Sequence, residues 1–285
     1  MRKPATEGVA RRAKTRVAAI SGSPSRGCRA VACALLAGAF ASPLPAAAAD
    51  EAADSWRFEV TPYLWATGLD GTLAITARPQ AGVAVQQSFS DLFKILDFAA
   101  SGSFEARNGR WGVLFDAVYF KVSDTAAVTG PQGFVTLAAD GTVTQQMYTL
   151  LASYRVSDGP SQVDLLGGLR YASVEGEADL RATLPQLPSA GRSFGQKEHW
   201  VDPVIGARIR HPLGERWTLV GYADVGGFGI GSDLSWQVIA GANYAFSPGI
   251  VGKLGYRVVA FDYSEQNFAY DMRFAGPYAG VGFSW

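Results

Sequence analysis

Residues 200–211 read WVDPVIGARIRH, and apolar and polar side chains alternate through this stretch. Successive side chains of an extended strand point to opposite faces. One face would hold only apolar residues: Val201, Pro203, Ile205, Ala207 and Ile209. The other would hold Asp202, Arg208 and Arg210, together with Val204 and Gly206. One continuous apolar face is what contact with lipid requires, because exposed polar groups in hydrocarbon are costly.

The same period of two recurs along the chain in segments of similar length. Ten candidate strands cover approximately 56–66, 98–107, 111–123, 142–156, 163–174, 200–211, 217–228, 234–246, 250–262 and 270–285. Short gaps with turn residues (108–110, 157–160, 213–216, 247–249) alternate with mostly longer polar gaps (67–97, 124–141, 176–199, 229–233, 264–269). Short periplasmic turns and longer external loops are typical of outer-membrane barrels. We predict an all-β, antiparallel up-and-down transmembrane β-barrel, with ten strands favoured and eight or twelve still open.

Aromatic residues mark the strand ends beside the short gaps. Trp111 and Trp217 begin strands, whereas Tyr154, Tyr244 and Phe246 end them. We interpret them, with the terminal Trp285, as a girdle at the membrane interface, where amphipathic rings prefer to lie. The alternative is that they are ordinary strand aromatics. The final strand ends on an aromatic residue and so resembles the signal that the outer-membrane assembly machinery recognises, although Trp stands where Phe is usual.

The net charge of zero conceals two unlike parts. Residues 1–49 hold eight Lys or Arg and one Glu, a net charge of +7, so the rest of the chain carries −7. A basic start, an apolar run over 30–44 and four alanines at 46–49 predict a cleavable signal peptide over 1–49. A short periplasmic segment at 50–55 and the barrel at 56–285 would follow, with Met1 not necessarily the true start. Cys28 and Cys33 both lie in the predicted signal, which argues against disulfides in the exported chain.

Several stretches resemble a family of Gram-negative outer-membrane β-barrel proteins of unassigned function. The matching residues lie at 61–66 (TPYLWA), 68–71 (GLDG), 104–107 (FEAR), 200–203 (WVDP), 221–229 (GYADVGGFG), 231–234 (GSDL) and 254–257 (LGYR). The resemblance covers nearly all of 56–285. It implies the fold and a location in the outer membrane, with export by the N-terminal signal. It implies no activity.

Charges of both signs lie on the expected inner faces. The candidate lumen residues are Glu59, Glu105, Arg107, Asp116, Asp164, Arg170, Asp202, Arg208, Arg210, Asp224 and Arg257, with Arg57, Arg155 and Lys253 beside them. Arginine pairs with carboxylates through two hydrogen bonds, and a small barrel is filled by its own side chains. We therefore expect a structural or small-channel protein with a charge-paired lumen. The alternative is a passive porin-like transporter whose charges select small solutes.

Enzymatic chemistry finds little support in the sequence. Some barrels of this size are enzymes of the outer rim that modify lipid A or, like the omptins, cleave peptides. His199 falls at the outer rim and His211 at the periplasmic end. Asp202 is three residues from His199, and residues i and i+3 face opposite sides of a strand. We expect no enzyme, no cofactor and no metal site, since the loop acids lack metal-binding spacing.

Two further expectations concern the loops and the partners. Ser90 could cap a short helix from Asp91 at the barrel mouth, with Phe93 and Leu96 on one face, or the segment is an irregular strand entry. The expected partners are outer-membrane lipid, lipopolysaccharide and the assembly machinery. Nucleic acid is not expected, because the charge is balanced. The loop 176–199, with Pro185, Pro188 and Gly191, is expected to be mobile.

Overall fold

The computed structural model describes residues 55–75, 83–129, 136–183, 190–265 and 268–285. Contacts divide the chain into two units, Met1–Ala49 and Asp50–Trp285. The predicted signal peptide and all but the last residue of the predicted 50–55 segment lie outside the described residues, as do Pro185 and Pro188. No helix among the described residues is long and apolar enough to cross a membrane.

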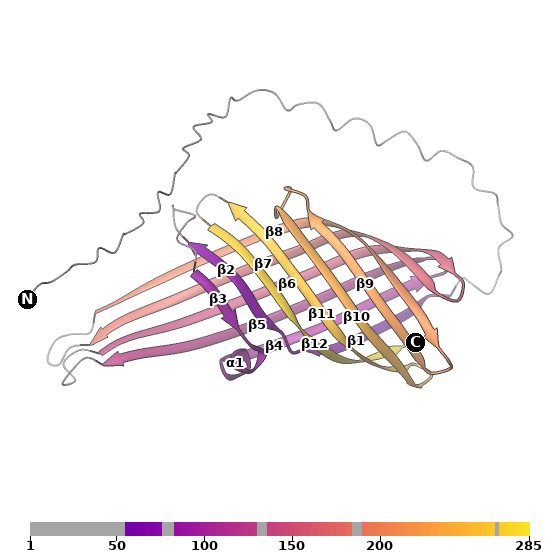
Figure 1. Ribbon diagram of the computed structural model, residues 1–285, viewed down its shortest axis with the longest axis horizontal. Helices are drawn as coiled ribbons and strands as arrows, with labels where there is room; N and C mark the ends of the chain where they lie inside the picture. Colours follow the sequence, from indigo (N-terminus) through magenta and orange to yellow (C-terminus); the bar gives the residue numbers. More distant parts are fainter. Residues whose placement is uncertain (1–54, 76–82, 130–135, 184–189, 266–267) are drawn as a thin grey trace, which may run out of the picture. The chain divides into compact units, whose positions relative to one another are not determined.

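Antiparallel strands close into a barrel (Figure 1). The elements are β1 (Arg57–Trp65), β2 (Gly68–Ile75), β3 (Val83–Gln87), α1 (Phe89–Lys94), β4 (Leu96–Asn108), β5 (Trp111–Thr129), β6 (Thr136–Asp158), β7 (Gln162–Thr183), β8 (Ala190–Leu213), β9 (Trp217–Gly227), β10 (Leu234–Ser247), β11 (Ile250–Glu265) and β12 (Phe268–Ser284). Strands β4 to β12 pair in chain order, and β1 joins β4 to β12. The ten-strand antiparallel barrel is therefore confirmed.

The two additional strands, β2 and β3, do not add new places around the barrel. β2 follows β1 along β12, and β3 pairs with β2 on the side where β4 pairs with β1. β1 and β2 pair with successive parts of β12, and only Ala66 and Thr67 separate them. β3 pairs with β2, while β4 pairs with β1, and α1 lies between β3 and β4 in the chain. The wall is thus interrupted twice at nearly the same height, once between β1 and β2 and once between β3 and β4. The sequence prediction, which placed 67–97 between two strands, was wrong over β2 and β3, whereas the short helix it offered as an alternative near Asp91 is present as α1.

Strands β5 to β8 are much longer than the apolar pattern predicted. β5 pairs with β6 as far as Thr129↔Thr136, and β7 pairs with β8 as far as Ala182↔Ala190. Most of 124–141 and 176–199, expected as loops, is therefore strand, and these strands project beyond the others in Figure 1. Neighbours such as Asp179 and Leu180 are both exposed. With water on both faces, no apolar face is needed, so the alternation that marks the membrane strands is absent.

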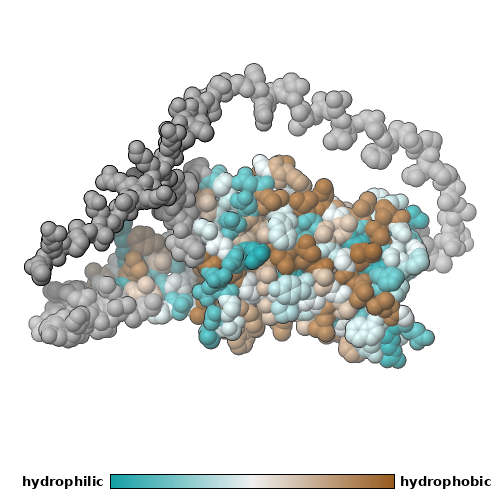
Figure 2. All heavy atoms as spheres, viewed as in Figure 1, coloured by the Kyte–Doolittle hydropathy of each residue, from teal (hydrophilic) through white to brown (hydrophobic). Residues whose placement is uncertain are grey.

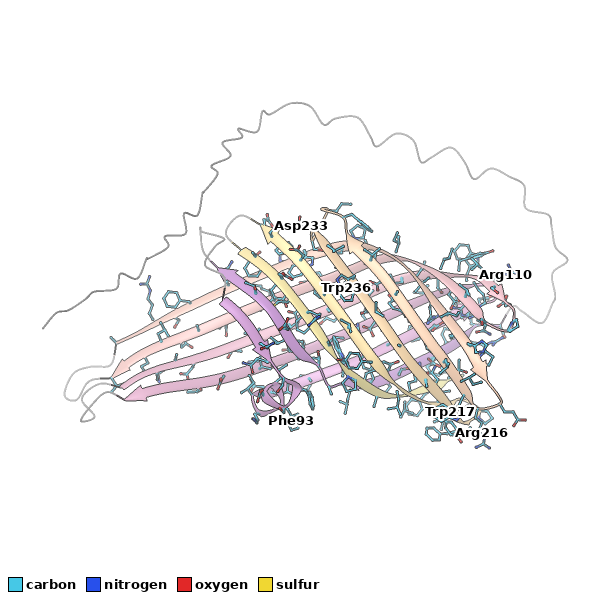
Figure 3. All side chains as sticks on the ribbon, viewed as in Figure 1. Phe93, Arg110, Arg216, Trp217, Asp233 and Trp236 are labelled. Atoms are coloured by element: carbon cyan, nitrogen blue, oxygen red, sulfur yellow. The ribbon has the colours of Figure 1, made fainter. Side chains whose placement is uncertain are left out.

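The short turns gather at one end of the barrel. Gly109, Gly214 and Gly249 adopt φ of 53°, 70° and 85° in the turns β4–β5, β8–β9 and β10–β11, a region that glycine enters without a side-chain clash. Figure 3 shows Arg110, Arg216 and Trp217 at this end. Since β1 begins and β12 ends here as well, this is the turn end that the sequence assigned to the periplasm.

The outer surface of the barrel is rich in apolar side chains. Exposed examples on the strands are Leu150, Leu165, Leu169, Ile205, Leu219, Val238 and Leu254. Figure 2 shows hydrophobic residues across much of the visible outer face. The buried set, in contrast, includes many charged groups, among them Asp164, Arg170 and Asp202. This inversion of an ordinary globular core is the arrangement that a lipid-facing wall requires.

Candidate functional site

Asp164 organises the lower part of the lumen, near the turn end. Its fully buried carboxylate accepts hydrogen bonds from four arginines. The donors and distances are Arg107 Nη2 at 3.1 Å, Arg155 Nε at 2.9 Å, Arg208 Nη2 at 2.9 Å and Arg210 Nη2 at 3.0 Å. We call these five residues, together with Glu105, the acid–arginine cluster. Its four cations exceed its two carboxylates, so each carboxylate is held by several donors.

Glu105 extends this cluster across the barrel. Arg208 Nη1 and Nη2 each donate to one carboxylate oxygen of Glu105 at 2.8 Å, a bidentate pair. Glu105 lies on β4 and Arg208 on β8, with β5, β6 and β7 between them in the wall. Lys253 Nζ reaches Glu59 Oε1 at 2.5 Å from β11 to β1. The lower lumen is therefore crossed by ion pairs rather than merely lined by charge.

A second ionic group lies higher in the lumen, around Arg257. Its Nη2 donates to Asp116 Oδ1 at 2.8 Å and to Gln237 Oε1 at 2.7 Å. Its guanidinium carbon lies 4.9 Å from the centre of the Trp65 ring, within the range of a cation–π contact. Arg257 is on β11 and Asp116 on β5. This pair also joins strands that are far apart around the wall.

Arg170 and Asp224 form a third group, and both side chains are fully enclosed. Arg170 Nη2 lies 2.6 Å from Asp224 Oδ2, and Arg170 Nε donates to Thr149 Oγ1 at 3.2 Å. The Tyr222 hydroxyl donates to the same Asp224 oxygen. A cavity of about 170 Å³ lies among these groups, with Glu105, Asp116 and Arg208 in its lining. It separates the ionic groups of the lumen from one another.

Asp202 has a different role from the other candidate lumen charges. Its carboxylate accepts from the Ser232 backbone N–H at 2.6 Å and from the Ser232 hydroxyl at 2.8 Å. Ser232 belongs to the turn between β9 and β10, where Gly231 lies so close that a Cβ would be 2.3 Å from the Val201 carbonyl oxygen. Asp202 therefore anchors a turn against β8. The remaining expected candidate, Arg57, is exposed at the start of β1.

An aromatic layer lies in the lumen above the ionic groups, and the sequence prediction missed it. Trp200 stacks on Tyr263 with 4.3 Å between ring centres and contacts Phe261 at 5.7 Å. Tyr270 on β12 donates its hydroxyl to Gln145 Oε1 on β6 at 2.8 Å. The buried members of this layer are Val118, Met147, Ala172, Val174, Trp200, Val259, Phe261, Tyr263, Phe268, Tyr270, Met272 and Phe274. Its contacts connect opposite sides of the wall.

A signal for this layer was present in β12. Residues 268–274 read FAYDMRF, in which large apolar residues share one face and Asp271 and Arg273 share the other. Counting back by twos from the outward-facing Val281 places Asp271 and Arg273 outside. Phe274 and Met272 then point inward, and both are buried. The assumption that the more apolar face always meets lipid was wrong for this upper part of the strand.

The six candidate interface aromatics lie at the turn end. Trp111 packs on Tyr154 and Trp217 packs on Tyr244, each with ring centres 4.8 Å apart, and Tyr244 also contacts Phe246 at 5.1 Å. Trp285 lies 5.9 Å from Phe58. Trp111, Trp217, Phe246 and Trp285 are exposed and all face outward. The geometry is an outward ring of paired aromatics beside the turns.

The two histidines lie far apart on β8, His211 near its end and His199 towards its middle. His199 is exposed, and its ring lies 6.3 Å from that of Tyr171. His211 Nδ1 lies 2.9 Å from the Ser161 hydroxyl at the turn end. Among the described residues, no group of three His, Cys, Asp or Glu side chains is arranged to hold a metal ion.

The segment before β4 is a helix, with a different cap from the one predicted. Ser88, not Ser90, is the N-cap: its hydroxyl accepts from the Asp91 backbone N–H at 3.3 Å. The Ser88 hydroxyl and Lys94 both lower the pKa of Asp91, the hydroxyl more strongly. The helix runs from Phe89 to Lys94, so Leu96 belongs to β4. The prediction placed the cap two residues late, because two serines flank Phe89.

Comparison with solved structures finds membrane barrels. The outer membrane protease OmpT from Escherichia coli is 11% identical, with a TM-score of 0.53, and the match covers 81% of this chain and 97% of that one. The translocator domain of autotransporter NalP from Neisseria meningitidis matches at 14% identity and a TM-score of 0.36, over 82% and 90% of the two chains. Ail, the attachment invasion locus protein of Yersinia pestis, matches at 10% identity and a TM-score of 0.30, over 81% and 99%.

Neither the protein-family models nor the curated proteins match this chain. At 11% identity, the likeness to OmpT concerns the fold alone. The closed antiparallel wall, the apolar outer face and this likeness agree. The chain has the fold of the Gram-negative outer-membrane transmembrane β-barrel proteins.

Proposed function

We propose that this protein is an integral outer-membrane barrel with a structural role, whose lumen is closed to solutes and whose outer strands are available for surface contacts. The observation that carries the proposal is the double closure of the lumen. Ion pairs cross it at Glu105–Arg208 and Asp116–Arg257, and the aromatic layer crosses it above them. A general diffusion pore needs a continuous water path, which two such layers oppose.

Single-channel recording in planar bilayers tests this proposal. The folded protein should give no conductance steps above the lipid background, while a general porin in the same bilayers gives them. A double variant, Trp200→Ala with Tyr263→Ala, removes the best-stacked pair of the aromatic layer but leaves the ionic groups. It should also stay silent, because the lower closure remains. Stable steps from the unmodified protein would contradict the closed lumen and favour the porin-like alternative.

We propose further that the chain is not an enzyme of the outer rim. Support comes from the separation of His199 and Asp202, since the exposed imidazole and the buried carboxylate lie on opposite faces of β8. Asp202 is engaged by Ser232. Any peptide or lipid A hydrolysis by the purified protein that is lost in His199→Ala, but not in His211→Ala, would contradict this proposal.

The proposed partners are outer-membrane lipid, lipopolysaccharide and the assembly machinery. The exposed aromatic pairs support lipid contact, and the end of β12 supports recognition during assembly, because Phe283 and Trp285 both present exposed rings. Replacing Trp285 by Phe should preserve the yield of the assembled protein, and Trp285→Asp should lower it. The amount of heat-modifiable protein in isolated outer membranes measures the difference. Equal yields would remove Trp285 from the recognised signal.

A further inference from the structure

The barrel wall is interrupted on one side, between β1 and β4. These strands pair from Arg57↔Arg107 to Pro62↔Gly102. Beyond that point the described residues show no further ladder between them, and β3 pairs with β2 alone. The Ser101 hydroxyl donates to the Tyr63 carbonyl oxygen at the place where the ladder stops. The backbone pairing that joins β1 to β4 below this point is therefore replaced here by a side-chain contact.

A cavity of about 230 Å³ lies at this interruption. Some of its lining belongs to the lumen side of the strands: Trp65, Val118 and Phe120. Other lining residues, Leu64 and Phe93, are among the exposed apolar residues of the outer surface. Because inner and outer side chains line the same space, the cavity passes through the wall.

The lining of this cavity is suited to hydrocarbon. It contains no charged residue. The Thr67 hydroxyl donates to the Gly68 carbonyl oxygen at 2.8 Å, and the indole N–H of Trp65 donates to the Gly276 carbonyl oxygen at 3.2 Å. These polar groups have partners inside the protein and do not need a polar ligand. An enclosed apolar cavity of about 150 Å³ stays dry and accepts benzene, so a space of this size and lining can hold hydrocarbon.

Helix α1 covers the outer side of the cavity. Leu92 is buried, and its neighbours Phe89 and Phe93 are 45% and 65% exposed, with ring centres 5.8 Å apart. Figure 3 shows Phe93 on α1, at the edge of the barrel. In water, two adjacent exposed phenylalanines on a six-residue helix would be unfavourable. In contact with lipid, the same side chains are stabilised.

The cavity lies at the height of the outer leaflet of the membrane, near the edge of its hydrocarbon. On β5, Trp111 marks the turn end of the outward apolar face, and Tyr119 lies beside the cavity. At about 3.4 Å per residue and a tilt of about 40°, this interval spans about 20 Å along the barrel axis. The apolar band of such barrels is about 25 Å tall. The opening therefore faces the hydrocarbon of the outer leaflet, near its edge.

We propose that this cavity holds one hydrocarbon chain of an outer-leaflet lipid, which enters sideways from the membrane between β1 and β4, beside α1. The site rests on the proposed membrane location but not on the proposed closure of the lumen. The chain contacts Phe93 and Leu64 at the surface and ends against Trp65 and Phe120. The protein thereby fastens a lipid to its wall at the point where the strand ladder is missing.

Tryptophan quenching by brominated lipid tests the proposal, because Trp65 lines the cavity. The folded protein is placed in vesicles of phosphatidylcholine brominated in the middle of its acyl chains, or of the same lipid without bromine. The difference in emission between the unmodified protein and Trp65→Phe isolates the Trp65 component. In a sealed wall, an inward-facing Trp65 is shielded from bromine. We expect instead that its emission falls by about half.

Filling the cavity provides the matched variant. Ala99 lines it and is exposed to it, so Ala99→Phe should restore the Trp65 emission in brominated vesicles. Ala240 is also exposed, on the opposite wall in β10, and Ala240→Phe should leave the quenching unchanged. Each of the two variants is also made in the Trp65→Phe background, so that the Trp65 component is obtained in the same way.

The outcomes separate the two proposals. Quenching of the outer tryptophans Trp111 and Trp217, with heat-modifiable mobility, reports insertion, and its failure would overturn the proposed membrane location. Insertion without quenching of the Trp65 component would overturn the lipid site alone. Quenching of Trp65 in detergent by a free brominated fatty acid, but not by vesicle lipid, would assign the cavity to a soluble ligand and also overturn the lipid site.

Discussion

The lower and upper halves of the lumen are filled by opposite kinds of side chain. Below, Asp164 and Glu105 are held by arginines from several strands. Above, Trp200, Tyr263 and Tyr270 pack ring against ring. Both halves join distant strands, but an ion pair depends on every partner being present, whereas an apolar layer loses stability in proportion to the atoms removed.

This difference shows why a membrane barrel tolerates charge at its centre. Arginines from β4, β6 and β8 converge on one carboxylate, so the desolvation of that carboxylate is offset by several charge-assisted hydrogen bonds. The aromatic layer needs no such convergence. It does need large side chains that reach across from β8, β11 and β12.

The largest expected effect comes from breaking the centre of the ionic half. Asp164→Ala leaves its arginines with one fewer buried counter-charge and should lower the free energy of unfolding by about 3–5 kcal/mol. Urea unfolding in vesicles, followed by tryptophan emission, measures the change. Asp158→Ala is the matched control, because Asp158 meets Arg155 and Arg110 at the exposed turn. It should change stability by less than about 1 kcal/mol. Equal losses would contradict the central position of Asp164.

A smaller effect is expected from the apolar half. Met272→Ala removes a buried side chain of the aromatic layer and should lower the free energy of unfolding by about 2–3 kcal/mol, through lost burial and a new cavity. Met272→Leu, which nearly conserves the volume, should lower it by less than about 1.5 kcal/mol. If the leucine variant is as unstable as the alanine variant, packing volume does not govern this layer.

A hydrogen bond joins Tyr270 of the aromatic layer to Gln145 on β6. Tyr270→Phe removes the hydroxyl that donates to Gln145 and should lower the free energy of unfolding by about 1 kcal/mol. Gln145→Leu in the Tyr270→Phe background should then add little, because the two groups act as a pair. A double-mutant cycle from urea unfolding measures their coupling. Additive losses would show that the hydroxyl has another function.

The smallest effect is expected outside both halves, on the extended strands. Lys197 and Glu175 form an ion pair at 2.8 Å with both side chains partly exposed. Glu175→Gln should change the free energy of unfolding by no more than about 0.5 kcal/mol, because solvent screens the pair. A loss comparable with that of Asp164→Ala would mean that the extended strands carry stability that their exposure does not suggest.

Several features were predictable because they depend on local rules. The alternation in 200–211 and in nine other segments predicted the wall, and the glycine turns at 109, 214 and 249 predicted which strand ends meet. The eleven candidate lumen charges could be picked out by the parity of their positions. Odd or even position along a strand shows which face a residue lies on, but not which residues it contacts. It therefore could not predict that Asp202 accepts from Ser232 whereas Asp164 accepts from several arginines.

Other features could not be predicted, because the alternation of apolar and polar residues does not mark them. The extended parts of β5 to β8 have water on both faces, so no apolar alternation marks them. The segment 67–97 has too little regular pattern to reveal β2 and β3, whereas the serine cap did indicate a short helix near Asp91. The aromatic layer inverts the alternation of the membrane strands, since Phe274 and Met272 face the lumen.

The sequence by itself determined the ten strands that form the membrane wall, the glycine turns between them and the inward position of the lumen charges, because a strand's period of two is a property of neighbouring residues. Only the tertiary structure decided which inward residues meet, since Glu105 and Arg208 are 103 positions apart and become neighbours only when the barrel closes. The opening beside α1 likewise exists only in three dimensions. It results from two interrupted wall positions, β1–β2 and β3–β4, lying side by side, and no pattern within either segment records that adjacency.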